Sequence, residues 1–221
     1  MSKRERGQRE AYQNSNGPVR ILVTGFKPYR KITLNTSEAV VGTLKTGEFN
    51  TIDFHTAVLP VSFKQASRKI TTLTEDIRPD IIIMLGIASK TTSLRIEKAA
   101  MNVHDRSSRN KDLPIVPEGP AAFFTNWPVK RLLTALKKAK VPTSLSYHAG
   151  TYVCNYTFYS VARHLTTTNQ DTLFGFVHLP CLPEEAVNLG PKNHGSMSLE
   201  LAVKGVAVII RELVKITTKT T

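Results

Sequence analysis

Cysteine is scarce in this sequence, which contains only Cys154 and Cys181 among 221 residues. Two cysteines cannot form a disulfide framework, so we expect both to be free thiols in a reducing compartment. The sequence also has no apolar run as long as a membrane-spanning helix requires. Its first residues, MSKRERGQRE, lack the apolar centre of a secretory signal. These absences predict a cytoplasmic protein with no membrane partner.

Acidic residues are outnumbered, with 17 Asp and Glu against 30 Lys and Arg, for a formal net charge of +13. A basic surface attracts polyanions, so nucleic-acid binding has to be considered. The densest basic clusters are KRER, FKPYRK and LKKAK, and none resembles an RNA-binding signature with interleaved aromatic residues. We therefore interpret the charge as general surface charge, which disfavours nucleic acid as a partner. No histidine pair has zinc-ligand spacing such as H-E-x-x-H, and we predict no metal.

Apolar runs that end in glycine alternate with segments of helical spacing. Residues 1–17 are polar and end in NSNGP, which predicts a disordered extension before a single domain over 18–217. Runs such as VRILVTG and RPDIIIMLG are typical of buried parallel strands. The alternation predicts an α/β domain with a mostly parallel sheet. Strands are expected at 19–25, 52–61, 78–86, 143–148 and 172–180, and helices at 36–45, 63–77, 127–140, 151–166 and 196–216.

The segment 88–126 fits neither pattern and contains several prolines and glycines. It is too long for a simple connection, so we expect it to be functional or to form a small sheet of its own. Open α/β sheets place their sites beyond the carboxyl ends of the strands. Residues that follow predicted strands are therefore the first candidates for chemistry.

Cys154 lies near the start of a predicted helix, where free N–H groups and a partial positive charge stabilise a thiolate and can hold an oxyanion. His178 ends the apolar strand LFGFVH, the position from which a general base would reach the strand-end crevice. Other histidines in or near loops, His104, His148 and His194, stay open as alternatives.

A third group should orient the histidine, and few acids lie near predicted strand ends. Glu97 and Asp105 both fall in the irregular segment, and the residues alone do not decide between them. Cys181 is the rival nucleophile, but a proline and two acids follow it and no helix start is expected directly after it. Negative neighbours raise the pKa of a thiol, which favours Cys154 over Cys181.

Three ordered motifs resemble those of pyroglutamyl peptidase I, a family also called pyrrolidone-carboxylate peptidase. AGTYVCN is similar to the family's cysteine motif, GFVHLP to its histidine motif and IEKAAMNVHD to its glutamate motif, within a match from about residue 19 to 215. The resemblance implies Cys154, His178 and Glu97 as catalytic residues and a three-layer α/β/α sandwich around a mostly parallel, twisted sheet. It also implies no cofactor, a homo-oligomer (dimer or tetramer), and peptides with an N-terminal pyroglutamate as partners and substrates.

The resemblance further implies a pocket in which two aromatic side chains flank the pyrrolidone ring. Pyroglutamate is a compact, uncharged lactam, so its pocket needs apolar faces and a few backbone donors and acceptors. The aromatic faces fall on the loop after the first strand, and strand-end backbone supplies the polar contacts. The expected substrate-binding residues are Phe26, Tyr29, Gly86, Ile87, Asn35 and Asn102.

Several positions depart from the family pattern. GFKPYRK stands where the family usually has GFEPFGG, which makes the pocket mouth bulkier and more basic. Thr91 takes the place of an arginine that the family has near the reacting centre, and Lys90 and Arg95 are the candidates to supply its charge. Two other functions therefore stay open: a catalytically impaired homologue that binds RNA or another polyanion, and a related cysteine-dependent amidase with a different acyl group.

Overall fold

The computed structural model describes residues 17–44, 52–105, 113–190 and 194–218. The expected N-terminal extension lies outside these residues, apart from Gly17. The strands are β1 (Val19–Phe26), β2 (Ile52–Leu59), β3 (Ile81–Ile87), β4 (Leu94–Glu97), β5 (Ala99–Met101), β6 (Ala122–Phe124), β7 (Thr143–Ser146) and β8 (Leu173–Leu179). The helices are α2 (Thr36–Thr43), α3 (Phe63–Ile77), α4 (Val129–Lys138), α5 (Val153–Thr167), α6 (Pro183–Asn188) and α7 (Leu199–Thr217).

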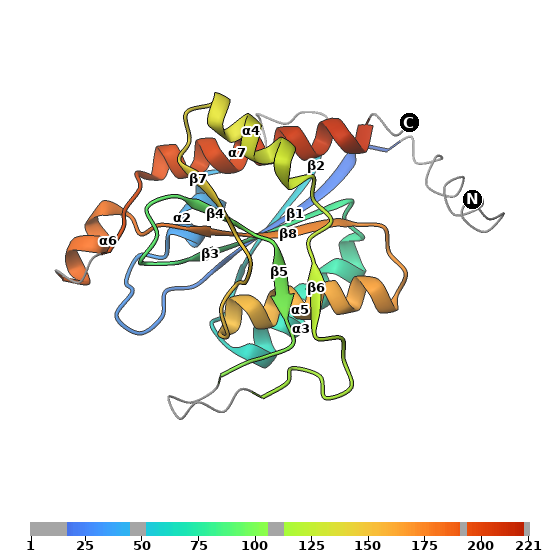
Figure 1. Ribbon diagram of the computed structural model, residues 1–221. Helices are drawn as coiled ribbons and strands as arrows, with labels where there is room; N and C mark the ends of the chain where they lie inside the picture. The colour runs from blue at the N-terminus through green and yellow to red at the C-terminus, as the bar shows by residue number, and fades with distance from the viewer. Residues whose placement is uncertain (1–16, 45–51, 106–112, 191–193, 219–221) are drawn as a thin grey trace.

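The central sheet has the strand order β2-β1-β3-β8-β4-β7. Its neighbouring strands pair in parallel, except that β4 runs antiparallel to β8. Helices α4 and α7 lie on one side of the sheet, and α3 and α5 lie on the other (Figure 1). The prediction of a three-layer α/β/α sandwich around a mostly parallel sheet is confirmed.

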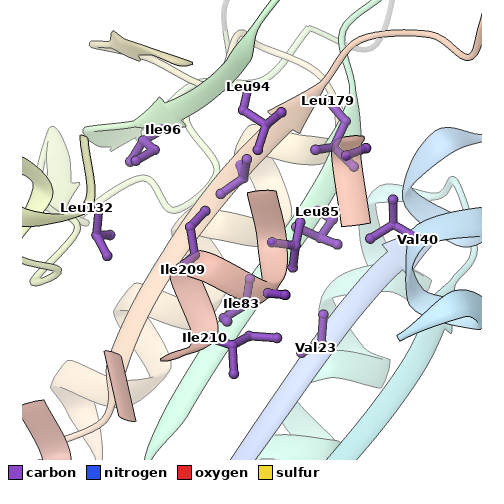
Figure 2. Close-up of a cluster of buried hydrophobic side chains, with 14 of the residues drawn as sticks. Val23, Val40, Ile83, Leu85, Leu94, Ile96, Leu132, Leu179, Ile209 and Ile210 are labelled. Carbon is purple, nitrogen blue, oxygen red and sulfur yellow. The ribbon is translucent and has the colours of Figure 1, made fainter. Parts of the chain in front are cut away.

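Both faces of the central strands are buried, because helices cover both sides of a parallel sheet. Successive side chains of a strand point to opposite faces. In β3, Ile83 and Leu85 join the cluster against α7, whereas Ile82 and Met84 join the cluster against α3 and α5. Figure 2 shows the first cluster, in which side chains from the sheet meet Ile209 of α7.

The irregular segment differs in one respect from the expectation. It does contain a small sheet of its own, in which β5 pairs with β6. The residues LRIE, however, form β4 and enter the central sheet between β8 and β7. Leu94 and Ile96 are buried on the α7 side, so this strand obeys the two-residue period. Four residues are too few for that period to be recognised in the sequence.

Helix α6 begins at Pro183, two residues after Cys181. The expectation that no helix start follows Cys181 is therefore wrong. Proline is favoured in the first turn of a helix because it lacks the N–H group that would be unpaired there. The sequence carries this signal, and two acidic residues follow the proline in the same first turn.

The longest of the described helices, α7, has 19 residues. It buries Val206, Ile209 and Ile210 against the sheet and exposes polar positions such as Lys204. Across the part of the chain that the structure describes, no helix has both the length and the apolar composition needed to cross a membrane.

Candidate active site

The carboxyl ends of β3 and β8 meet the start of α5. Gly86 of β3 pairs with His178 of β8, and Cys154 is the second residue of α5. A Cβ atom added to Gly86 would lie 2.9 Å from the Cys154 sulfur and 2.9 Å from the ring of Phe176. Because glycine has no side chain, the Cys154 thiol can approach the end of β3 closely.

Glu97 and His178 are brought together by the antiparallel pairing of β4 with β8. Glu97 lies opposite Phe176, two residues before His178, so the Glu97 and His178 side chains share a face of the sheet as diagonal neighbours. Glu97 Oε1 lies 2.7 Å from His178 Nδ1. Glu97 is completely buried, and His178 is 7% exposed. Because a carboxylate only accepts hydrogen bonds, Nδ1 carries the proton and Nε2 is left for other chemistry.

The protonation of His178 is set by competing influences. Burial on its own lowers the pKa of this imidazole, because it disfavours the charged form. The Cys154 side chain and the Glu97 carboxylate favour the charged form through hydrogen bonds and charge, and together they raise the pKa of His178 to about 9. His178 is therefore an imidazolium at neutral pH, between Cys154 on one side and Glu97 on the other.

Arg95 adds a cation beside this group. It lies directly opposite His178 in the β4–β8 pairing, and its Nη2 is 3.3 Å from Glu97 Oε1. The same nitrogen donates to Ser146 Oγ at 2.7 Å, which ties the guanidinium to β7. Lys90, the other candidate for the charge, is exposed. Of the two, Arg95 is thus the one that contacts Glu97.

Thr91, at the position where the family has an arginine, is buried and forms hydrogen bonds with residues close to it in the sequence. Its Oγ1 donates to the carbonyl of Ser93 at 3.0 Å and accepts from the Ser93 N–H at 3.3 Å. Its own N–H donates to the carbonyl of Ala88 at 3.1 Å. Thr91 therefore shapes the connection between β3 and β4.

The rival candidates occupy other surroundings. Cys181 is fully buried, and burial, followed by the charge of Glu185, raises the pKa of its thiol. His104 packs against the rings of Phe63 and Tyr156, with centroids 5.3 and 5.5 Å away. His148 is exposed, and its Nδ1 accepts from the N–H of Gly150 at 3.2 Å. Of the two acids that the sequence left open, Glu97 is the one bonded to His178.

The two aromatic residues expected at the substrate lie at and after the end of β1. Phe26 is 3% exposed and belongs to the cluster under α3 and α5. Tyr29 is half-buried, and its ring faces that of Tyr152, the residue that precedes α5, with centroids 5.9 Å apart. Ile87 ends β3, next to Gly86. These residues therefore surround the start of α5 on the side of β1 and β3.

The side chains of Asn35 and Asn102 form hydrogen bonds to other parts of the protein. Asn35 caps α2 by accepting from the N–H and hydroxyl of Ser37, and its Nδ2 donates to the carbonyl of Lys27 at 3.1 Å. Asn102 donates to the carbonyls of Val116 and Gly119 and accepts from the N–H of Val116. Each side chain thus anchors a loop beside the site.

Asn155 is a residue of this region that the sequence reasoning missed. It is completely buried, and its Oδ1 accepts from the N–H of Met101 at 2.9 Å. Its Nδ2 donates to the carbonyls of Met101 and Val103 at 2.9 and 2.8 Å. Asn155 therefore fixes the first turn of α5 to β5. Its signal in the sequence was its place directly after Cys154, at the end of AGTYVCN.

The arrangement combines a thiol, an imidazole and a carboxylate, which is the chemistry of covalent acyl transfer. Within the described ranges, no three His, Cys, Asp or Glu side chains lie close enough to hold a metal ion. The first turn of α5 adds N–H groups that have no partner within the helix, and Tyr152 provides no side-chain cap. Such N–H groups can stabilise a developing oxyanion.

Comparisons with known proteins point in one direction. The pyroglutamyl peptidase family model matches residues 19–216. A pyrrolidone-carboxylate peptidase of Yersinia pestis is 34% identical over 175 residues, which cover 76% of this chain and 81% of the relative. The structure resembles the pyroglutamyl peptidase I of Bacillus amyloliquefaciens, with a TM-score of 0.82, 28% identity, and coverage of 89% of this chain and 95% of that one. It also resembles the pyrrolidone carboxyl peptidase of Pyrococcus furiosus, with a TM-score of 0.84, 30% identity, and coverage of 90% and 100%.

Proposed function

The chain belongs to the pyroglutamyl peptidase family of hydrolases, and we propose that it removes N-terminal pyroglutamyl residues from peptides with Cys154, His178 and Glu97. The observation that carries this assignment is the line of contacts from Glu97 Oε1 to His178 Nδ1 and from His178 to Cys154. A thiol, a base and an orienting carboxylate are the three parts that cysteine-dependent acyl transfer needs.

The first half of the proposed reaction forms an acyl-enzyme. Before the attack, the proton of the Cys154 thiol lies on His178, and the Cys154 thiolate attacks the carbonyl carbon of the pyroglutamyl residue. The carbon–sulfur bond forms, and the carbonyl oxygen becomes an oxyanion that N–H groups at the start of α5 stabilise. His178 then gives its proton to the peptide nitrogen. The carbon–nitrogen bond breaks, and the shortened peptide leaves with a free amine.

The second half returns the enzyme to its starting state. Water attacks the thioester while His178 Nε2 accepts a proton from it. The carbon–sulfur bond breaks, pyroglutamate leaves, and the proton on His178 is again shared with the Cys154 sulfur. Throughout both halves, the Glu97 carboxylate holds the Nδ1–H of His178, so Nε2 faces the thiol.

Substrate selection is assigned to the region between β1, β3 and α5. Phe26 and Tyr29 supply apolar surface for the lactam ring, and the backbone at Gly86 and Ile87 supplies polar contacts. Asn35 and Asn102 act on this pocket through the loops that they anchor. A neutral pocket of this kind suits an uncharged lactam better than a charged N-terminal amine.

Arg95 is assigned the role of a positioning residue. Its contact with Glu97 Oε1 supplies positive charge beside a carboxylate that is completely buried. A buried charge without a partner is costly, so this contact offsets part of the cost of burying the Glu97 carboxylate. The bond to Ser146 keeps the guanidinium in place.

A fluorogenic pyroglutamyl amide, assayed with two protein variants, tests the assignment. Cys154→Ala removes the nucleophile, and we expect turnover to fall by at least about 10³-fold. Cys181→Ala removes the other thiol and should keep turnover, because Cys181 is completely buried and its thiol is not accessible to a substrate. Mass spectrometry of a slow pyroglutamyl ester should detect the acyl group on Cys154 alone. Normal turnover by Cys154→Ala would reject the proposal.

The same assay separates the alternative functions. A related amidase would cleave other acyl amides as well as the pyroglutamyl amide, and pyroglutamate analogues would not compete with its substrate. A polyanion-binding homologue would bind RNA with a steep salt dependence and would show negligible turnover. We expect competition by pyroglutamate analogues and selective cleavage of the pyroglutamyl amide.

A further inference from the structure

The loop after β1 contains Arg30, a cationic residue with an unusual backbone conformation. The N–H of Ile32 donates to the carbonyl of Tyr29 at 3.1 Å, which closes a tight turn with Arg30 and Lys31 at its centre. Arg30 has a φ of 57°, in the left-handed region that residues with a side chain rarely adopt. Strained residues of this kind concentrate at binding sites and catalytic sites.

The loop is anchored on both sides of the turn. Before it, the N–H of Lys27 donates to the carbonyl of Leu59 at 3.0 Å. After it, the N–H groups of Thr33 and Leu34 donate to the buried carboxylate of Glu185 at 3.1 and 2.9 Å. These bonds fix the backbone of the turn, so Arg30 is presented in a defined direction.

Two aromatic rings support the Arg30 side chain. Its guanidinium lies 5.1 Å from the centre of the Tyr29 ring and 6.0 Å from that of Tyr152. The Arg30 guanidinium donates to the Tyr29 hydroxyl, and a guanidinium has five N–H donors, so further donors are left for an acceptor. Arg30 is exposed, so these N–H groups are accessible to a ligand. The hydrogen bond from Tyr152, and next that from Arg30, lower the pKa of the Tyr29 hydroxyl.

The position of this cation relates it to the reaction. Tyr152 immediately precedes α5 and lies two residues before Cys154. Its ring also packs edge-on against Phe63 at the start of α3, with centroids 5.2 Å apart. Arg30 therefore lies beside the residue that precedes α5, where a substrate chain that extends from Cys154 past Tyr152 would meet it.

The positive charge of this loop indicates that its ligand is negatively charged. Lys27 and Lys31 are exposed on either side of Arg30, and they add to its positive potential. Glu185, the acid that binds this loop, is buried and occupied by the backbone of Thr33 and Leu34. A hydrogen-bond acceptor that carries negative charge complements such a surface.

We propose that Arg30, supported by Tyr29 and Tyr152, is a specificity-determining residue that binds a carboxylate of the departing peptide. The carboxylate is an acidic side chain in the first residues after pyroglutamate, or the C-terminal carboxylate of a very short peptide. This proposal rests on the proposed peptidase function and adds a preference that the function alone does not contain.

Matched peptides test the preference through ratios of kcat/KM. Pyroglutamyl-Glu-Leu amide is compared with pyroglutamyl-Gln-Leu amide, and pyroglutamyl-Gln with a free carboxylate is compared with its amide. We expect the charged member of at least one pair to be cleaved about 5- to 10-fold better, as for one charge-assisted contact near the surface. The first pair assigns the contact to a side chain and the second to the terminal carboxylate. Equal cleavage within both pairs overturns the proposal.

Three variants assign the preference to Arg30. Arg30→Gln and Arg30→Gly should each bring the ratio to about 1, and Arg30→Gly relieves the left-handed strain, so folding is safeguarded. Lys31→Gln removes one charge from the same turn and should keep most of the ratio. An equal fall of the ratio in Lys31→Gln would instead indicate the general charge of the loop and overturn the role of Arg30. The fluorogenic pyroglutamyl amide has no peptide after pyroglutamate, so its cleavage reports the proposed peptidase function by itself. If this amide is cleaved and neither peptide pair shows a charge preference, the proposal about Arg30 fails and the proposed peptidase function stands.

Discussion

The two faces of the central sheet are built for different purposes. The face against α7 buries apolar side chains such as Ile83, Leu85 and Ile209. The face against α5 also buries apolar residues, but near the carboxyl ends of its strands it buries Glu97 and His178 as well. Oxygen Oε2 of Glu97 has no hydrogen-bond partner among the described residues. The α7 face thus serves stability, whereas the α5 face accepts unfavourable burial of polar groups in exchange for chemistry.

Among the changes that test this comparison, a change of Glu97 should lower activity the most. Glu97→Gln keeps the shape of the side chain but removes the charge that orients His178. We expect kcat/KM to fall by about 10²- to 10⁴-fold, as when an orienting carboxylate is neutralised in other triads. Circular dichroism should report an unchanged fold. Activity within a few-fold of the unaltered protein would show that Glu97 does not orient the histidine.

The same variant has a pH signature with a defined sign. Glu97 is among the groups that raise the pKa of His178 to about 9, so the charged imidazole is present below that pH and lost above it. The alkaline limb of kcat/KM should lie near pH 9 in the unaltered protein. In Glu97→Gln it should move to lower pH, because one favourable partner of the imidazolium is gone. A limb that stays in place would contradict this account of His178.

A change of Gly86 on the α5 face should have a smaller effect on activity, and it tests the position of the Cys154 sulfur. In Gly86→Ala the new methyl group would meet the Cys154 sulfur and the Phe176 ring at 2.9 Å, so the thiol must move. Because a misplacement of about 1 Å can lower a rate by about 10²-fold, we expect kcat/KM to fall by up to about 10²-fold. The matched control is Gly42→Ala in α2, where nothing lies within 4 Å of the added atom. That variant should keep full activity and gain about 0.5–1 kcal/mol of helix stability.

On the α7 face, a large change in stability should leave the chemistry intact. Ile209→Ala removes a completely buried side chain, and we expect the free energy of unfolding to fall by about 2–5 kcal/mol. Denaturant titration measures that loss. At temperatures where the variant stays folded, its kcat/KM should equal that of the unaltered protein. A fall of kcat/KM in the folded variant would mean that the two faces are coupled.

Among the changes at the site itself, a change of Arg95 should have the smallest effect on activity. Arg95→Gln keeps a donor for Ser146 but removes the charge beside Glu97, and we expect kcat to fall by about 3- to 10-fold with KM unchanged. Arg95→Lys, which keeps the charge, should restore part of the lost rate. A rise in KM instead would place Arg95 at the substrate rather than behind Glu97. Stability should change little, because the side chain is about one-third exposed.

Much of the fold could be predicted because its signals are local. Apolar runs that end in glycine identified β1 and β3, and helical spacing identified α3 and α7. The start of α5 next to Cys154 was also readable from the sequence. The four-residue strand β4 was not, because so short a segment shows no period that distinguishes it from a loop. The family motifs named Glu97, but no local signal in 88–126 separated it from Asp105.

The sequence by itself determined the alternation of strands and helices, the cysteine at a helix start and the histidine at a strand end. The family motif named Glu97, but only the tertiary structure showed how Glu97 reaches His178 and that Arg95 is the cation beside it. Glu97 meets His178 across 81 positions of sequence because β4 enters the sheet antiparallel to β8 in one particular register. A shift of that register by one residue would turn Glu97 to the opposite face, where Leu94 and Ile96 now pack. Such pairings depend on the packing of the whole sheet, which short-range patterns do not encode.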